Sequence, residues 1–320
     1  MAAIASPSNP SSYTRKRIDL TFTLGPKTNL LTGVTTQPTF TGSNNSNQVK
    51  LSRLRVSAAI QQAGGSSQGA LDLRVYGMTQ SLMNDLFSIT GSNSPIVANS
   101  NTVIVEAGDD VSGVSIVYNG SISNARADYS GAPDTAFQVT GLSAYKIGLT
   151  AATPTSFPGT ADVATIMGSI ASRMGFAFEN NGVSVKLSNP YFPGDLLTQA
   201  ETVKRHAGIE MICTDGVLAI WPKGGSRGGV VPLISPETGM IGYPVKTALG
   251  VECTTLFNPS IRFGGKVQVQ SSNTPCCGTW SVYQMTHNLE AEMPDGQWFT
   301  HLTLIPVGFI SLNTQTVLSS

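Results

Sequence analysis

Hydrophobic and polar residues alternate along the first 150 residues in the two-residue period typical of β-strands. In RIDLTFTL (residues 17–24) every second residue is apolar, which predicts a strand with one buried face. Residues 49–60 begin in the same way, but the apolar positions change parity at Ser52–Arg53, which predicts a β-bulge. Residues 71–78 predict another strand, and VSIVYNGSIS (residues 114–123) predicts a hairpin that turns at Asn119–Gly120.

Apolar residues at the spacing of an α-helix occur once in the first 150 residues and are common in the region that follows. Thr79 can cap a short helix that ends at Phe87, because its apolar residues fall on one side. After Asp162 the apolar residues recur every three or four positions, and after Asp195 they do so again until Gly208. Each helix precedes a predicted hairpin, with turns at 181–182 and 215–216. Two helix-plus-hairpin units therefore make a small α+β module.

The last region returns to the period of a strand. The valines of GGKVQVQSS (residues 264–272) alternate with polar residues, which predicts a strand with one buried face. Residues 278–293 and 297–309 predict a hairpin that turns at Asp295–Gly296. Trp280 and Trp298 flank this hairpin, and we expect both indoles to be buried in its core.

The expected fold is therefore mainly β (α+β), with an α+β module between two sheet-rich domains. The predicted boundaries are 1–150 for the first sheet-rich domain, 151–228 for the module and 229–320 for the second sheet-rich domain. Each segment falls within or near the usual size range of a domain.

Low charge suggests an assembly protein. Charged residues make up 12% of the chain, and 19 basic residues balance 19 acidic ones, so no overall field attracts nucleic acid or an anionic membrane. The cores of protein interfaces are depleted in charge. The N-terminal residues do not resemble a signal peptide, and no run of about 18 apolar residues predicts a membrane span. We expect a protein made and kept in a cytoplasm, without membrane insertion.

The cysteines and histidines give a weak chemical signal. A Cys–His nucleophile or a zinc site would need ligand spacings of the C-x₂-C or H-x₃-H type, and none occurs. The alternative is free thiols beside packing or surface histidines, and we favour it. We therefore expect no cofactor and no metal. The residues concerned are Cys213, Cys253, Cys276, Cys277, His206, His287 and His301.

Two charged groups invite functional hypotheses. Glu290, Glu292 and Asp295 could be the carboxylates of a sugar hydrolase, but acidic residues near a turn more often keep strand ends solvated. Seven basic residues in the first sixty face only one acidic residue, Asp19, so this end could grip phosphate or an acidic protein neighbour. We favour the protein contact, because aromatic residues do not alternate with the basic ones. The seven are Arg15, Lys16, Arg17, Lys27, Lys50, Arg53 and Arg55.

Two long stretches resemble a known family. GMIGYPVKTALGVECTTLFNPSIRFGGKVQVQSS, followed by GTWSVYQMTHNLEAEMPDGQWFTHLTLIP, resembles the C-terminal part of baseplate hub proteins of tailed bacteriophages, especially contractile-tailed ones, with late control D proteins as more distant relatives. PGTADVATIMGSIASRMGFAFENNGVSVKLSNPYFPGDLLTQAETVKRHAGIEMICTDGVLAIWPKGG resembles the middle of the same family. The resemblance covers about residues 158–306 and carries no catalytic signature.

The resemblance implies a structural part of the virion, assembled in the host cytoplasm. Such a hub closes the end of the tail tube, seats the central spike and lines the channel through which DNA leaves without sequence-specific binding. Its sheet-rich domains would be tube-like β-barrels, and its partners would be the tail tube protein, the central spike protein, and other baseplate and tape-measure proteins. The residues that carry the family pattern are Phe257, Asn258, Pro259, Gly264, Gly265, Trp280 and Trp298.

The symmetry of the tail that the resemblance implies predicts that the chain forms a homotrimer. If a sixfold tube must join a threefold spike, three copies that each carry two similar barrel-like units present six tube-like faces and keep threefold symmetry. Two rival functions remain. A tail-associated cell-wall hydrolase would need an extra segment, and a receptor-binding tail protein would explain the Ser/Asn-rich loops but not the α+β module.

Overall fold

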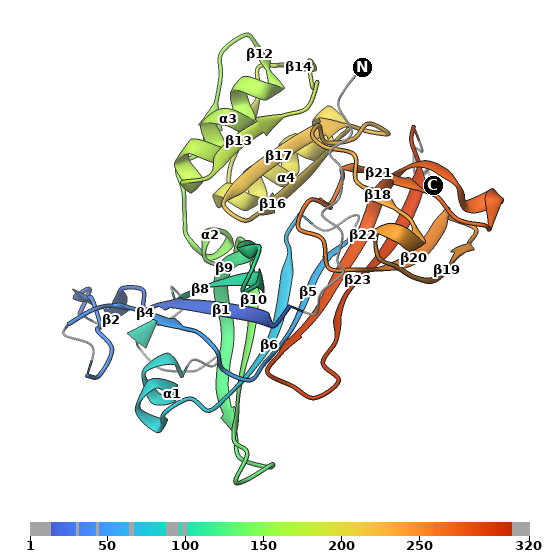
Figure 1. Cartoon of the computed structure of the whole chain (residues 1–320). Helices are drawn as coiled ribbons and strands as arrows, with labels where there is room; N and C mark the ends of the chain where they lie inside the picture. Colours follow the sequence, from blue (N-terminus) through green and yellow to red (C-terminus); the bar gives the residue numbers. More distant parts are fainter. Residues whose placement is uncertain are drawn as a thin grey trace, which may run out of the picture.

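The alternating segments of the two outer regions form strands of one large, mostly antiparallel sheet, and the two helical segments of the middle region lie in a separate module beside it (Figure 1). The computed structural model describes residues 14–29, 32–42, 45–63, 67–87, 96–97 and 101–308. The Ser/Asn-rich loop at 89–101 lies largely outside the described residues. Within the described part, no helix combines the length and apolar character that a membrane span requires.

The described residues of the first region form ten strands and two short helices. They are β1 (Lys16–Thr23), β2 (Lys27–Asn29), β3 (Thr35–Thr36), β4 (Gln48–Leu51), β5 (Val56–Ala63), β6 (Ala70–Tyr76), α1 (Gln80–Leu86), β7 (Ile96–Val97), β8 (Thr102–Asp109), β9 (Gly113–Asp128), β10 (Ala136–Leu142) and α2 (Tyr145–Leu149). The predicted cap of α1 is confirmed, because the Thr79 hydroxyl accepts a hydrogen bond from the Leu82 amide.

The second region packs two amphipathic helices against a small sheet. Its elements are β11 (Thr155–Ser156), β12 (Thr160–Asp162), α3 (Val163–Met174), β13 (Ala177–Asn180), β14 (Lys186–Ser188), β15 (Tyr191–Phe192), α4 (Leu196–Ala207), β16 (Ile209–Thr214) and β17 (Val217–Pro222). Asp162 and Asp195 cap the two helices, and Gly175 and Gly208 end them in the left-handed conformation. These helix boundaries agree with the sequence prediction.

The third region returns to sheet. Its elements are β18 (Leu233–Ile234), η1 (Pro236–Thr238), β19 (Met240–Lys246), β20 (Val251–Leu256), β21 (Lys266–Val269), η2 (Thr274–Cys276), β22 (Gly278–Ala291) and β23 (Trp298–Pro306). The predicted hairpin is confirmed: β22 and β23 pair antiparallel around the turn at Asp295. The valines of β21 are buried and its polar residues are not.

The two sheet-rich regions are continuous with each other. The 13-stranded sheet has the order β19-β20-β23-β22-β5-β6-β10-β9-β8-β1-β4, with β21 paired to β22 and β18 paired to β21. The connection is made by β5 and β22, which pair along residues 56–63 and 284–291. The mainly β fold class is thus confirmed. The domain boundaries at 150 and 228 stay a prediction, because hydrogen bonds cross between the outer regions.

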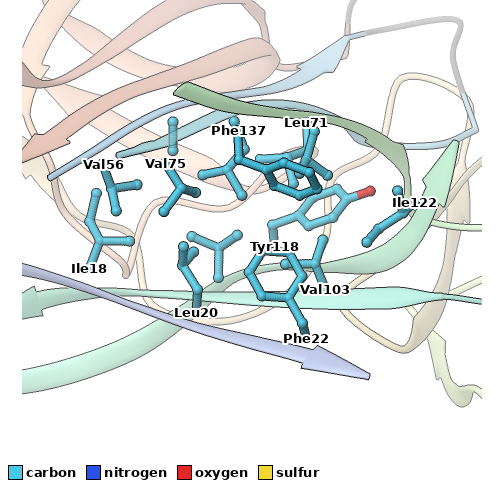
Figure 2. Close-up of a cluster of buried hydrophobic side chains, with 14 of the residues drawn as sticks. Ile18, Leu20, Phe22, Val56, Leu71, Val75, Val103, Tyr118, Ile122 and Phe137 are labelled. Atoms are coloured by element: carbon cyan, nitrogen blue, oxygen red, sulfur yellow. The ribbon is translucent and has the colours of Figure 1, made fainter. Parts of the chain in front are cut away.

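Three buried clusters hold the molecule together, and two of them join regions. The first lies under the first region's strands, where Phe22, Tyr118 and Phe137 are buried (Figure 2), but Trp298 from β23 belongs to it as well. The second lies under the third region's strands and includes Trp221 from β17. The third lies within the α+β module. Apolar burial therefore ties the outer regions to each other and to the module.

Three turn predictions are wrong. At Ser52–Arg53 there is no β-bulge. These residues belong to the connection between β4, which pairs with β1, and β5, which pairs with β6, and Arg53 has a φ of 60°. Strand β9 runs straight through Asn119–Gly120, and the hairpin turn lies at 110–112 instead. The turn at Asn181–Gly182 does not close a hairpin, because β13 pairs in parallel with β17 while β14 pairs with β12. Only the second unit of the module is a helix with a hairpin.

Close packing explains the glycine at 120. A Cβ there would lie 2.5 Å from the Tyr118 hydroxyl oxygen and 2.7 Å from the Ser143 Cα, so no side chain fits. The glycine therefore makes room for the buried Tyr118 ring rather than supplying a positive φ for a turn.

Candidate assembly surface and the joint between regions

The loop at residues 257–265 connects β20 to β21 and contacts all three regions. Its first residue, Phe257, packs edge-on against two rings of the β22–β23 hairpin, with centroid distances of 5.3 Å to His287 and 5.8 Å to Trp298. Phe257 also packs against the first region's core. This contact anchors the start of the loop at the pairing of β5 with β22.

The next residues turn the chain into the second core. The Asn258 side chain accepts a hydrogen bond from the Ser260 amide at 2.9 Å, and the Asn258 carbonyl accepts one from the Ile261 amide at 3.2 Å. This local turn needs a polar side chain at the first position and suits the proline that follows. Ile261 and Phe263 are then buried, and Phe263 meets Trp221 of β17 at 6.2 Å.

Gly264 and Gly265 hold the loop against β22 and Arg227 through backbone hydrogen bonds. Gly264 has φ 73°, and a Cβ there would lie 2.7 Å from the Trp221 ring. Its amide donates to the Val282 carbonyl at 3.0 Å, and the Val282 amide donates to the Gly265 carbonyl at 2.9 Å. The Gly264 carbonyl accepts from the Arg227 amide at 2.7 Å. A side chain at 264 would break this three-way contact.

A half-buried ion pair connects the same loop to the α+β module. The Arg227 guanidinium binds both oxygens of Glu179 on β13, at 3.2 and 2.7 Å, and lies close to the Phe263 carbonyl at 3.5 Å. The Arg227 hydrogen bond is the main reason that the pKa of Glu179 is lowered. Arg227 is 8% exposed and the Glu179 side chain is 30% exposed, so this bidentate pair is only partly shielded from solvent. Sequence reasoning missed it, because 48 residues separate the partners.

The two predicted tryptophans are buried, each with 7% exposure. Trp298 joins the loop through Phe257, whereas Trp280 lies in the second core. The Trp280 indole donates to the Cys276 carbonyl at 3.0 Å, and the Lys246 ammonium lies 4.3 Å from the ring centroid. The structure thus gathers six of the seven predicted family residues around the joint. Their role in the family stays a prediction.

A cleft of about 350 Å³ lies where the three regions meet. Its lining comes from β5, β9, β13, the β16–β17 turn, the loop and β22. Burial raises the pKa of Asp215 in that turn to about 6, although hydrogen bonds and two arginines oppose the shift. Burial lowers the pKa of His287 to about 4, and its Nδ1 is 2.8 Å from the Thr300 hydroxyl. Periodicity gave no signal for this cleft.

The outer face of the large sheet is continuous across the two sheet-rich regions. Directly paired residues share a face, so the register of β20, β23, β22 and β5 places four uncharged polar residues in one row: Thr254, His301, Thr286 and Gln61. A neighbouring row continues to β9 through Asn288, Ala59, Asp72, Thr140 and Asn124. One flanking row holds Glu290 together with Arg74 and Arg126, and a different row holds Glu252. Charges of both signs are therefore interspersed among polar residues.

The cysteines and histidines that were considered as nucleophiles or metal ligands are buried or packed against neighbouring residues. All four cysteines are free, and burial raises the pKa of the Cys213 and Cys253 thiols to about 12. His206 packs against the Phe192 ring at 5.9 Å, and the His301 Nδ1 lies 2.9 Å from the Thr254 hydroxyl. In the part of the chain that the structure describes, no group of three His, Cys, Asp or Glu residues could hold a metal ion.

The predicted carboxylate cluster and the basic end pair with each other and with distant partners. Glu292 binds Arg15 at 2.6 Å, and Glu290 accepts from the Gln297 amide at 3.0 Å. Other pairs are Lys16–Asp109, Arg17–Asp19, Lys50–Glu106, Arg53–Asp110 and Arg55–Asp134. Six of the seven basic residues that look unopposed in the sequence therefore lie beside acidic ones, which favours a structural role over phosphate binding.

Solved structures with a similar fold include two tail proteins and a component of a type VI secretion system. The tail protein of Neisseria meningitidis MC58 matches with TM-score 0.55 and 10% identity, over 91% of this chain and 97% of that one. The 43 kDa tail protein of prophage MuSo2 from Shewanella oneidensis gives 0.53 and 11%, over 91% and 99%. The E. coli c3393 protein, a type VI secretion component described as similar to T4 tail proteins gp27 and gp5, gives 0.51 and 10%, over 79% and 73%.

These likenesses define the fold as that of a tail protein, and the sequence defines the family. A family model described as baseplate hub gp41 matches residues 36–300, which is most of the chain. The chain therefore belongs to the baseplate hub gp41 family, and its role is structural, in a phage tail baseplate. The resemblance stated from the sequence is confirmed. No curated protein matches the chain.

Proposed function

We propose that the protein is the hub that joins the sixfold tail tube to the threefold central spike and lines the channel through which DNA leaves. The observation that carries this proposal is the outer sheet face, which continues without a break from β20 to β9. A channel wall must present its residues to the lumen over a long stretch without loops or gaps. A continuous sheet face with interspersed charges meets that need and offers DNA no strong binding patch.

The homotrimer belongs to the same proposal. Each copy brings two sheet-rich regions, so three copies supply six, and the α+β module lies to one side of the sheet (Figure 1). The sheet ends in strands β4 and β19, which leave edges that a neighbouring copy can cover. Tube protein on one side and spike protein on the other complete the set of partners, with tape-measure and other baseplate proteins nearby. The E. coli relative's described likeness to gp27 and gp5 supports this arrangement.

A structure of the assembled tail end tests the proposal. We expect three copies of this chain per particle, with Thr286 and Asn124 of the outer face turned toward the central channel. Six copies, or a sheet face turned outward, would refute it. A cysteine at position 286 in a Cys277→Ser background gives a cheaper test. The thiol should react with maleimide in the isolated chain and be protected in assembled particles, whereas one at exposed Lys186 in the module should react in both.

A further inference from the structure

The cleft at the joint contains polar groups whose hydrogen-bonding capacity the chain does not use. Asp215 Oδ1 is buried and receives no hydrogen bond from the described residues. His287, which also lines the cleft, is bonded through Nδ1 to the Thr300 hydroxyl. The Arg262 side chain is exposed at the cleft, and there too no described residue bonds its guanidinium. An unpaired buried polar atom is costly, so the Oδ1 atom of Asp215, beside the exposed guanidinium of Arg262, points to a ligand.

The charges of the cleft specify a neutral ligand. Two arginines, Arg227 and Arg262, face two carboxylates, Glu179 and Asp215, while His287 is neutral. The formal charges therefore cancel at neutral pH. A cation entering the cleft meets both guanidinium groups, and an anion meets both carboxylates. A neutral group with a donor beside an acceptor can satisfy both signs at once, and a peptide or carboxamide group has that arrangement.

The walls of the cleft suit a polypeptide. Phe257, Val217 and Met285 give the interior an apolar surface, and Ile116 on β9 is 53% exposed at its edge. A volume of about 350 Å³ is at the lower end of the range for clefts that hold organic ligands. A short chain segment can therefore place its aliphatic atoms on these walls and its amide groups among the polar residues.

We propose that this cleft binds a short uncharged segment of an adjoining tail protein. An amide N–H of the segment donates to the carboxylate of Asp215, and an amide carbonyl accepts from the guanidinium of Arg262. His287 adds a further hydrogen bond from the floor of the cleft. The inference rests on the proposed hub role and adds the chemistry of one partner. Because the cleft is built by all three regions, a segment bound there also fixes their relative positions.

Site-specific photo-crosslinking in assembled particles tests where the segment lies. We would place p-benzoylphenylalanine at position 116, beside the cleft, and at position 111 as a control. Val111 is 80% exposed at the β8–β9 turn and does not line the cleft. Mass spectrometry of the cross-linked peptides should identify, from position 116 only, one segment of another tail protein without charged residues. Particle structure in the same preparation reports separately whether the hub is trimeric.

A binding measurement then tests the chemistry. The synthetic peptide with the cross-linked sequence should bind the full-length chain saturably in fluorescence anisotropy. Arg262→Glu should weaken binding at least tenfold, because three carboxylates would then face one guanidinium. Lys186→Glu makes the same charge reversal on an exposed residue of the module and should change nothing.

Several results would overturn the inference while leaving the hub proposal intact. These are equal cross-linking from positions 111 and 116, a cross-linked segment with charged side chains, a cross-link only to a second copy of this chain, and no cross-link in particles that are trimeric and complete. Equal affinity of wild type and Arg262→Glu would also overturn it.

Discussion

Asp215 is a position where a single substitution should stabilise the protein in a pH-dependent way. Its pKa lies near 6 in the folded chain, against 3.8 for the ordinary carboxyl group, and burial is the main cause. Each unit of pKa difference corresponds to about 1.4 kcal/mol, so the shift corresponds to at most about 3 kcal/mol. Ionising a buried carboxylate is therefore a cost of folding at neutral pH.

The sign follows from which state binds more protons. Between about pH 4 and pH 6 the folded chain keeps the Asp215 proton while the unfolded chain has lost it. The stability of the wild type therefore falls as pH rises through this window and stays low above it. Asparagine does not ionise, still offers an acceptor to the Asn119 amide, and tolerates the φ of 53° that this turn needs. Asp215→Asn should gain up to about 3 kcal/mol at pH 7.5 and little at pH 4.

Urea unfolding at the two pH values measures this difference. A control substitution, Asp295→Asn, changes the same residue type at the same φ of 53° in the exposed turn before β23. It isolates any benefit of asparagine in a left-handed turn, which is measured at both pH values and subtracted. The reasoning fails if Asp215→Asn is no more stable than wild type at pH 7.5, or if its gain is as large at pH 4.

Three further predictions concern the joint and the cores. Truncating Trp280 or Trp298 to alanine should cost about 3–5 kcal/mol in chemical denaturation, and unchanged stability in both would show that their burial contributes little. Gly264→Ala should destabilise the fold by more than 1 kcal/mol, because its φ of 73° and its contact with an indole both exclude a Cβ; a neutral result would mean that the loop shifts freely. Serine at both Cys276 and Cys277 should leave particle assembly intact, and stoichiometric zinc in the purified wild type would contradict this.

Sequence periodicity predicted the helices and strands well, but it predicted poorly which strands pair with one another. The caps at Asp162 and Asp195 and the β22–β23 hairpin follow from local rules, because the residues that decide them are neighbours in sequence. The two-residue period of residues 56–63 fixes which face is buried. It does not reveal that β5 lies beside β22, more than two hundred residues away. The union of the two sheet-rich regions therefore had no local signal.

Turn signals failed where a glycine or asparagine serves another purpose. Gly120 admits the Tyr118 ring, and the turn at Gly182, with φ 90°, leads away from the strand instead of reversing beside it. The cleft was missed for a related reason. Asp215 was visible in the sequence as half of an Asp–Gly turn, and only the fold places β9 and Arg227 around it.

Replacing the Asp215 carboxylate should raise the stability of the protein and weaken its binding to a partner. If its carboxylate receives a hydrogen bond from a bound segment, the charged acceptor is worth about 1 kcal/mol more than the amide oxygen of asparagine. Asp215→Asn should therefore bind the cross-linked peptide about fivefold more weakly at pH 7.5, while the same protein resists urea better. This combination separates a binding residue from a structural one, because a substitution that only damages the fold lowers both quantities. A variant that gains stability and keeps full affinity would show that the buried charge serves no partner.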